Sequence, residues 1–130
     1  MGRIGRRLAA VIACTAVMLM TVAIPTFATG EPRVVTCNGI KATMVGTLGD
    51  DVINGTAGDD VIVTRAGNDT VNAGAGNDIV CGGPGDDYLR GEAGDDILYG
   101  EKGRDKIFGH DGNDTIYGGS GKDQMAGDDG

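Results

Sequence analysis

Residues 46–126 read GTLGDDVIN GTAGDDVIV TRAGNDTVN AGAGNDIVC GGPGDDYLR GEAGDDILY GEKGRDKIF GHDGNDTIY GGSGKDQMA, nine units of nine residues without insertion or deletion. The fourth place is Gly in every unit, and the sixth place is always Asp. The eighth place is always apolar, from Ile53 in the first unit to Met125 in the last. Such a fixed period indicates a repeat architecture in which each unit stacks on its neighbours.

Each place in the unit has a physical interpretation. Gly at the first and fourth places allows backbone conformations that side chains forbid, as a tight loop requires. The last three residues form a minimal strand whose central side chain points inward. The sixth-place Asp puts a carboxylate at the end of the loop, and carboxylates together with loop carbonyls are the ligands that calcium prefers. The candidate metal ligands are therefore Asp51, Asp60, Asp69, Asp78, Asp87, Asp96, Asp105, Asp114 and Asp123.

The charge of the chain favours cations as partners. Three of the eleven Lys and Arg residues lie in residues 1–28, so residues 29–130 carry eight basic and nineteen acidic residues, a net charge of −11. This sign argues against nucleic acid and, once residues 1–28 are removed, against an anionic membrane as partners. The chain has 25 Gly and no Trp, so an ordinary bulky core cannot form.

The unit resembles the RTX, or hemolysin-type, calcium-binding repeat G-G-x-G-x-D-x-U-x, where U is a large aliphatic residue. The resemblance covers residues 46–130, and the stretch CNGIKATMVGTLGDDVING is similar to the opening of small secreted actinobacterial repeat proteins. It implies an all-β fold, a right-handed parallel β-roll with two nonapeptides per turn and calcium held between stacked loops. RTX toxins and proteases carry further domains that are missing here, so their activities do not carry over.

Calcium is expected to be needed for folding. One inward residue in nine makes a thin core, whereas ordering the backbone costs about 1–2 kcal/mol per residue. The rows of Asp also repel one another, and bound calcium would remove that repulsion and add its binding free energy to folding. We therefore expect several calcium ions and a largely unfolded metal-free chain. Arg104 and Lys122 replace the usual acidic or amide residue at the fifth place, which predicts weaker sites toward the C-terminus.

Residues 1–28 are typical of a secretory signal peptide. Arg3, Arg6 and Arg7 precede an apolar run from Leu8 to Ile24, and small residues precede a cleavage after Ala28. A retained membrane anchor and lipidation at Cys14 stay open as alternatives. The predicted organisation is a signal peptide in 1–28, an N-terminal segment and capping strand in 29–45, and the repeats in 46–130. The predicted localisation is extracellular.

Two cysteines, Cys37 and Cys81, remain after removal of the signal peptide. Export to an oxidising compartment favours a disulfide between them. The resemblance to secreted repeat proteins points the same way. Free or intermolecular thiols are the alternative.

The nine-residue frame extends back to residues 37–45, which predicts a tenth strand with Met44 inward. If alternate repeats share a sheet, the outer face of the even-numbered sheet is apolar and uncharged, whereas the odd face is mixed. Contiguous apolar surface usually marks an interaction site. We expect the segment with Val34 and Val35 to cover part of this face, pinned by the disulfide, and the remainder to bind a second copy or a partner. The alternative is that scattered apolar residues on a thin roll have no role. The candidate interface consists of Val61, Val63, Ile79, Ile97, Tyr99 and Tyr117.

The sequence does not favour an enzyme. The single His, His110, and the single Ser, Ser120, fall in loops on opposite edges of the expected roll, so a nucleophile pair cannot form. Two functions fit better. The first is a calcium-dependent structural or partner-binding protein without catalysis. The second is a calcium-dependent carbohydrate-binding accessory that uses exposed aromatic residues, for which the candidates are Tyr88, Tyr99, Phe108 and Tyr117.

Overall fold

A computed structural model describes residues 34–128 of the chain. These residues contain short strands and no helix, in agreement with the all-β prediction. None of their segments is a helix long and apolar enough to cross a membrane. The predicted signal peptide and the Cys14 alternative lie outside the described residues. The strands are β2 (Thr36–Cys37), β3 (Ile40–Lys41), β4 (Met44–Val45), β5 (Val52–Asn54), β6 (Val61–Val63), β7 (Thr70–Ala75), β8 (Ile79–Cys81), β9 (Tyr88–Ala93), β10 (Ile97–Tyr99), β11 (Lys106–Asp111), β12 (Thr115–Tyr117) and β13 (Gln124–Ala126).

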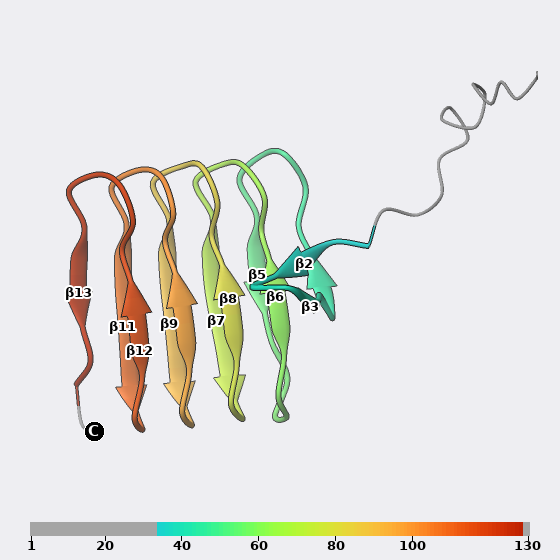
Figure 1. The fold of residues 1–130 in the computed structure, drawn as a ribbon, viewed down its shortest axis with the longest axis vertical. Coiled ribbons are helices and arrows are strands. Elements are labelled where there is room, and N and C mark those ends of the chain that lie inside the picture. The colour runs from blue at the N-terminus through green and yellow to red at the C-terminus, as the bar shows by residue number, and fades with distance from the viewer. Residues whose placement is uncertain (1–33, 129–130) are drawn as a thin grey trace, which may run out of the picture. The chain divides into compact units, whose positions relative to one another are not determined.

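The repeats form two parallel five-stranded sheets that face each other (Figure 1). One sheet has the order β12-β10-β8-β6-β4, and the other has the order β13-β11-β9-β7-β5. Each strand pairs with the strand 18 residues away, so that Leu98 pairs with Val80 on one side and Ile116 on the other. Two nonapeptides therefore make one turn, as a β-roll requires. Met44 pairs with Ile62, which confirms the tenth strand.

The core is a single layer of eighth-place side chains between the two sheets. Residues such as Ile62, Leu89 and Ile107 are fully buried and form one cluster. The layer opens at the C-terminal end, where the Met125 side chain is 54 % exposed because no further turn covers it. A core this thin leaves the loops at the two edges as a large part of the structure.

Fourth-place glycines allow these loops to stack directly on each other. Gly85 has φ +149°, and a Cβ at this residue would collide with the carbonyl oxygen of Gly67 in the preceding turn. No other residue type fits this close approach. The loops consequently repeat at the spacing of the strands, which brings equivalent side chains of successive turns together.

The N-terminal segment covers part of the outer face of the sheet formed by β4, β6, β8, β10 and β12, which we call the even face. β2 and β3 form an antiparallel hairpin, and Cys37 in β2 is joined to Cys81 in β8 by a disulfide with a Cα–Cα distance of 5.8 Å. Val35 packs against a small buried cluster of Cys37, Val63 and Cys81. Val34, in contrast, is 63 % exposed, so only one of the two predicted valines covers the face.

The hairpin itself was not predicted from the sequence, because each of its strands has only two residues. Beyond it, the even face continues to Tyr99 and Tyr117, whose rings stack with centroids 4.8 Å apart. Tyr117 is 51 % exposed. Part of the apolar face therefore remains open to solvent.

Candidate calcium sites

The fold arranges the nine sixth-place aspartates in two columns, one along each edge of the roll. The loops of odd-numbered repeats form the odd edge, and the loops of even-numbered repeats form the even edge. The odd edge carries Asp51, Asp69, Asp87, Asp105 and Asp123, and the even edge carries Asp60, Asp78, Asp96 and Asp114.

Within each column, one carboxylate oxygen is used by the backbone. Oδ1 of Asp87 accepts a hydrogen bond from the N–H of Asp69 at 2.8 Å, and Oδ1 of Asp105 accepts one from the N–H of Asp87 at 2.9 Å. On the even edge, Oδ1 of Asp96 accepts a bond from the N–H of Asp78 at 2.8 Å. Each carboxylate is thereby fixed under the loop of the preceding turn.

The second carboxylate oxygen has no partner in most of the column. Oδ2 is buried and accepts no hydrogen bond in Asp69, Asp78, Asp87, Asp96, Asp105 and Asp114. A buried charged oxygen without a partner is costly, because it has lost its water and gained nothing in return. Such atoms need either a proton or a cation.

Burial raises the pKa of these carboxyl groups. It brings the pKa of Asp87 to about 7, with repulsion from Asp69 and Asp105 acting in the same direction. The pKa of Asp96 rises to about 6 for the same reason, burial first and then repulsion from Asp78 and Asp114. Burial also raises the pKa values of Asp78 and Asp105. The columns are thus unfavourable as bare carboxylates at neutral pH.

A first-place glycine leaves space beside the unpaired oxygen. A Cβ on Gly82 would lie 2.5 Å from Oδ2 of Asp87 and 3.2 Å from the carbonyl oxygen of Gly100 in the next turn. The space beside Gly91 is bordered in the same way by Asp96 and the Gly109 carbonyl. We call each such space, with its carboxylate oxygen and its carbonyl oxygen, a cradle.

The donor set of a cradle fits calcium. Calcium takes carboxylate and backbone carbonyl oxygens and tolerates irregular geometry. Within residues 34–128, no three His, Cys, Asp or Glu side chains converge on one point. A cation in a cradle would therefore hold one carboxylate and complete its shell with main-chain carbonyls and water.

The sequence model of the RTX calcium-binding nonapeptide repeat matches residues 45–80, 82–114 and 102–130. The chain belongs to this family. RTX repeats bind calcium and have a structural role, which agrees with the cradles and with the β-roll. No curated protein and no solved structure matches the chain.

In the first two RTX repeats, Oδ2 of the sixth-place aspartate has hydrogen-bond partners within the protein. Asp51 Oδ2 accepts hydrogen bonds from the N–H and hydroxyl of Thr47 at 2.6 and 3.0 Å. Asp60 Oδ2 accepts the same pair of bonds from Thr56 at 2.7 and 2.9 Å, and its Oδ1 accepts one from the Thr43 hydroxyl at 3.2 Å. Although burial acts to raise it, these bonds bring the pKa of Asp60 below its ordinary value. This role of Thr47 and Thr56 was not predicted from the sequence, although Thr at the second place of the first two repeats is its signal.

Fifth-place residues form a second, exposed ladder outside the first. Asp86 Oδ1 accepts a bond from the N–H of Arg104 at 2.9 Å, and the Arg104 guanidinium donates to Asp86 Oδ2 at 2.8 Å. These two hydrogen bonds from Arg104, the backbone one first, lower the pKa of Asp86. Arg104 therefore pairs with the exposed carboxylate of the preceding turn and does not enter the cradle of Asp105.

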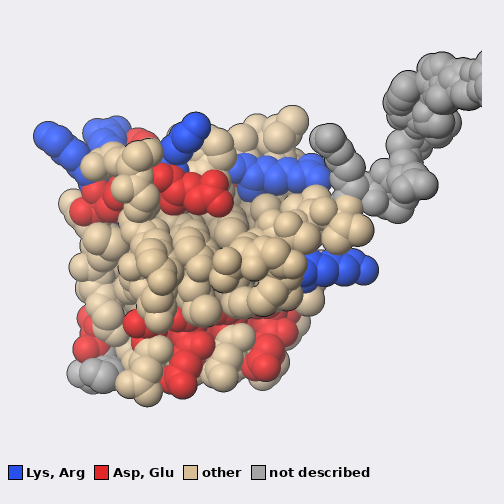
Figure 2. Space-filling view, viewed as in Figure 1, with Lys and Arg blue, Asp and Glu red and all other residues tan. Residues whose placement is uncertain are grey.

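The two edges of the roll differ in charge. Even-edge loops contain eight acidic residues and no Lys or Arg, whereas odd-edge loops contain eight acidic and four basic residues, Arg65, Lys102, Arg104 and Lys122. Figure 2 shows the difference: one edge is red without blue, and the other carries both colours. Cations of the protein itself thus compensate part of the charge on the odd edge only.

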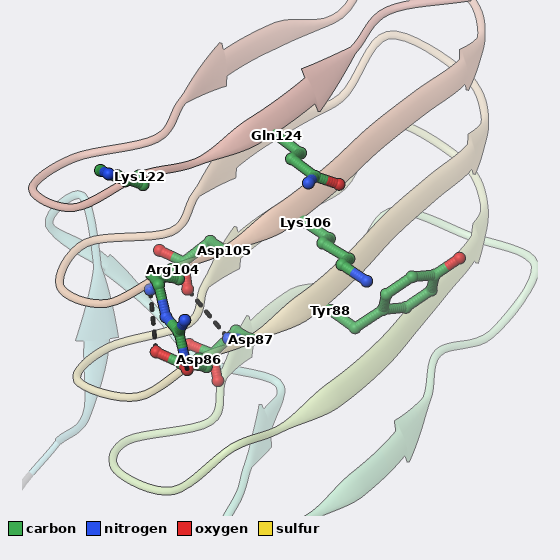
Figure 3. A pocket seen from close by; sticks show the side chains of 8 residues that line it. All are labelled: Asp86, Asp87, Tyr88, Arg104, Asp105, Lys106, Lys122 and Gln124. Carbon is green, nitrogen blue, oxygen red and sulfur yellow. Dashed lines mark hydrogen bonds and ion pairs between the residues drawn. The ribbon is translucent and has the colours of Figure 1, made fainter.

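A hollow of about 560 Å³ opens beside the last odd-edge loops (Figure 3). Tyr88, Lys106 and Gln124 line it from the sheet, and Arg104, Lys122, Asp86, Asp87 and Asp105 line it from the loops. The Tyr88 ring packs against that of Phe108, with ring centroids 5.5 Å apart. This hollow combines an aromatic ring with groups of both charges.

His110 lies near the end of β11, where the chain enters the even edge, and Ser120 lies in a loop of the odd edge. His110 Nδ1 is 3.3 Å from Asp128 Oδ2, and the Ser120 hydroxyl donates to the Glu101 carbonyl at 3.4 Å. They are not brought together with each other.

Proposed function

We propose that this RTX chain is a secreted calcium-binding protein whose repeats fold on calcium and which serves as a structural or partner-binding element without catalysis. The observation that carries the proposal is the column of buried, unpartnered Oδ2 atoms beside first-place glycines. The sixth-place aspartates named above would supply the carboxylate ligands, and first-place carbonyls would supply further oxygens.

The sites are proposed to weaken at the C-terminal end. Arg104 and Lys122 place positive charge beside the last odd-edge loops, which lowers the attraction for a cation. The buried, unpartnered Oδ2 atoms end at Asp114, and Asp123 is only partly buried. Calcium at Asp123 would therefore compete with water.

Secretion is proposed from the sequence alone. Residues 1–28 would be removed as a signal peptide, residues 29–45 would form the N-terminal segment and capping strand, and residues 46–130 would form the roll. The Cys37–Cys81 disulfide supports this proposal, because disulfides persist in oxidising compartments.

The open part of the even face is the proposed partner surface. Val63 belongs to the buried cluster with Cys37 and Cys81. Val61, Ile79 and Tyr99 pack against this cluster, whereas Tyr117, which stacks on Tyr99, is exposed. A second copy or an extracellular protein would bind at Ile97, Tyr99 and Tyr117. The supporting argument is that exposed apolar surface beside a covered part of the same face favours association.

A second candidate function, calcium-dependent carbohydrate binding, is favoured by the hollow beside Tyr88. An aromatic ring with amide and charged groups around it is a common way to bind a sugar. Binding of a glycan array by the calcium-loaded protein, and its loss on replacing Tyr88 with Ala, would support this candidate over the first.

Calcium titration followed by far-UV circular dichroism tests the main proposal. We expect a cooperative gain of β-structure that chelator reverses, with a midpoint of about 10⁻⁴–10⁻³ M, as for other extracellular calcium modules. A spectrum that is identical in calcium and in excess chelator would contradict it.

A further inference from the structure

The cradles are not equivalent along the chain. In repeats five, six and seven, a first-place glycine lies beside a buried, unpartnered Oδ2 and a carbonyl oxygen of the next turn. These three complete cradles contain Asp87, Asp96 and Asp105. All three aspartates are at least 98 % buried, so bulk solvent does not reach the unpartnered oxygens.

The cradles of repeats three and four are filled by side chains. Thr64 stands at the first place of repeat three, is fully buried, and donates its hydroxyl to the Gly82 carbonyl of the next turn. Ala73 stands at the first place of repeat four and is also fully buried. A hydroxyl or a methyl group thus occupies the space that a glycine leaves open in the following repeats.

The carboxylates of repeats one and two have partners already. Thr47 and Thr56 each donate two hydrogen bonds to Oδ2 of the Asp in the same repeat. These oxygens therefore do not need a cation. Repeats one and two thus satisfy the second oxygen with a threonine, whereas Asp69 and Asp78 of repeats three and four keep an unpartnered Oδ2 but lack an open cradle beside it.

The disulfide encloses the same four repeats. Cys37 begins the unit that leads into β4, and Cys81 is the last residue of repeat four. The hairpin packs on β6 and β8 within this loop, through Cys37, Val63 and Cys81. Covalent closure, a packed hairpin and the absence of a complete cradle coincide in residues 37–81, whereas complete cradles begin at Gly82.

We infer that calcium binds in the cradles of Asp87, Asp96 and Asp105, and that residues 34–81 form a calcium-independent base on which the later repeats fold when calcium binds. This inference rests on the proposed function, and it replaces the expectation of a largely unfolded metal-free chain with that of a half-folded one. Strands β7 and β8 lie at the end of this base. The first calcium-bound turn would therefore pair its strands β9 and β10 with strands that are already folded.

Hydrogen exchange on the disulfide-intact chain from residue 29 tests the inference. In chelator, we expect slow exchange of amides in residues 34–81 and fast exchange in residues 82–126, with calcium slowing only the latter. Equal exchange in both halves under chelator, with calcium protecting both, would overturn the inference but keep the proposed function. An absence of any calcium response would overturn both.

A matched pair of variants tests the cradles directly by counting bound calcium with equilibrium dialysis. Gly91→Ala puts a methyl group into the cradle of Asp96, as Ala73 does one even repeat earlier, and should lower the count by about one. Ala73→Gly opens the cradle of Asp78 and should raise the count by up to one. Unchanged counts in both variants would show that calcium does not bind in these cradles.

Discussion

Oδ1 of Asp78 accepts a hydrogen bond at 2.8 Å from the backbone N–H of Asp60, which lies 18 residues earlier and one turn away. The same bond is accepted by each sixth-place aspartate from Asp69 to Asp123, so from Asp69 to Asp114 each carboxylate has one oxygen in the backbone network and one outside it. This division explains how a residue can hold the loops together and still offer an oxygen to a cation. It also means that the two oxygens can be tested separately.

Replacing Asp96 with Asn separates the two roles. The amide oxygen can keep the bond to the Asp78 N–H, and the amide nitrogen can donate to the neighbouring Gly109 carbonyl. We expect weaker calcium binding but a calcium-free protein that is more stable by about 1–3 kcal/mol, since an unfavourable buried charge has gone. Thermal unfolding with and without calcium measures both effects. Asp95→Asn, in the exposed ladder, is the control, and a less stable calcium-free Asp96→Asn protein would contradict the interpretation.

The calcium-free protein should become more stable on mild acidification. Burial raises the folded-state pKa of Asp87 to about 7 and of Asp96 to about 6, above the ordinary value of 3.8. Folding therefore favours the protonated groups, and stability should rise as the pH falls from about 7 to about 4.5. The pKa values of Asp60 and Asp86 are lowered, so stability should fall again below about pH 4.

In saturating calcium, the stability of the protein should instead fall as the pH falls from about 7 to about 4.5, because protons compete with the ion for the same oxygens. Melting temperatures measured between pH 4 and 8, in chelator and in calcium, give the two curves. A calcium-free melting temperature that declines steadily from pH 7 downward would be inconsistent with the raised pKa values.

Loss of the disulfide should destabilise the N-terminal half. Closing a loop of 44 residues reduces the entropy of the unfolded chain by an amount worth about 4 kcal/mol in the chain-entropy treatment. The variant with both Cys37 and Cys81 replaced by Ser should show fast hydrogen exchange in the hairpin even with calcium present. Reducing agent should have the same effect on the natural protein and none on the variant. Unchanged protection of residues 34–41 after reduction would assign the stability of the hairpin to packing alone.

The partner surface can be tested by adding charge to the open part of the even face. Replacing Ile97 and Tyr117 with Asp should leave the calcium-bound circular dichroism spectrum intact and abolish self-association or partner binding. Val52→Asp is the matched control, because Val52 is 76 % exposed on the other sheet. Sedimentation in calcium measures the assembly state. A natural protein that is monomeric in calcium and captures no partner from its surroundings would rule this surface out.

The nine-residue frame predicted the strands, their inward residues and Met44 in the tenth strand. The pairing of alternate repeats in a parallel roll, seen for Leu98 with Val80 and Ile116, was implied by the resemblance to RTX repeats. The β2–β3 hairpin was not predicted, since Thr36, Cys37, Ile40 and Lys41 form strands too short to have a period. The nine-residue frame also does not distinguish one sixth-place aspartate from another. Their differences come from other places in the unit. A second-place Thr satisfies the oxygen in repeats one and two, and a first-place Thr or Ala fills the space beside it in repeats three and four.

The Cys37–Cys81 bond also determines how the molecule can yield to force. Strands β9 to β13 pair only with neighbours one turn away, and β13 is an edge strand. Tension on the C-terminus would therefore peel the roll one turn at a time, and each turn of 18 residues would release about 60 Å of extended chain. Unfolding must stop at Cys81, because the disulfide transmits the tension directly to Cys37 and the residues between the two cysteines carry none of it. Under tension the protein would therefore extend only by the length of the chain after Cys81, so the position of this cysteine sets the maximum extension.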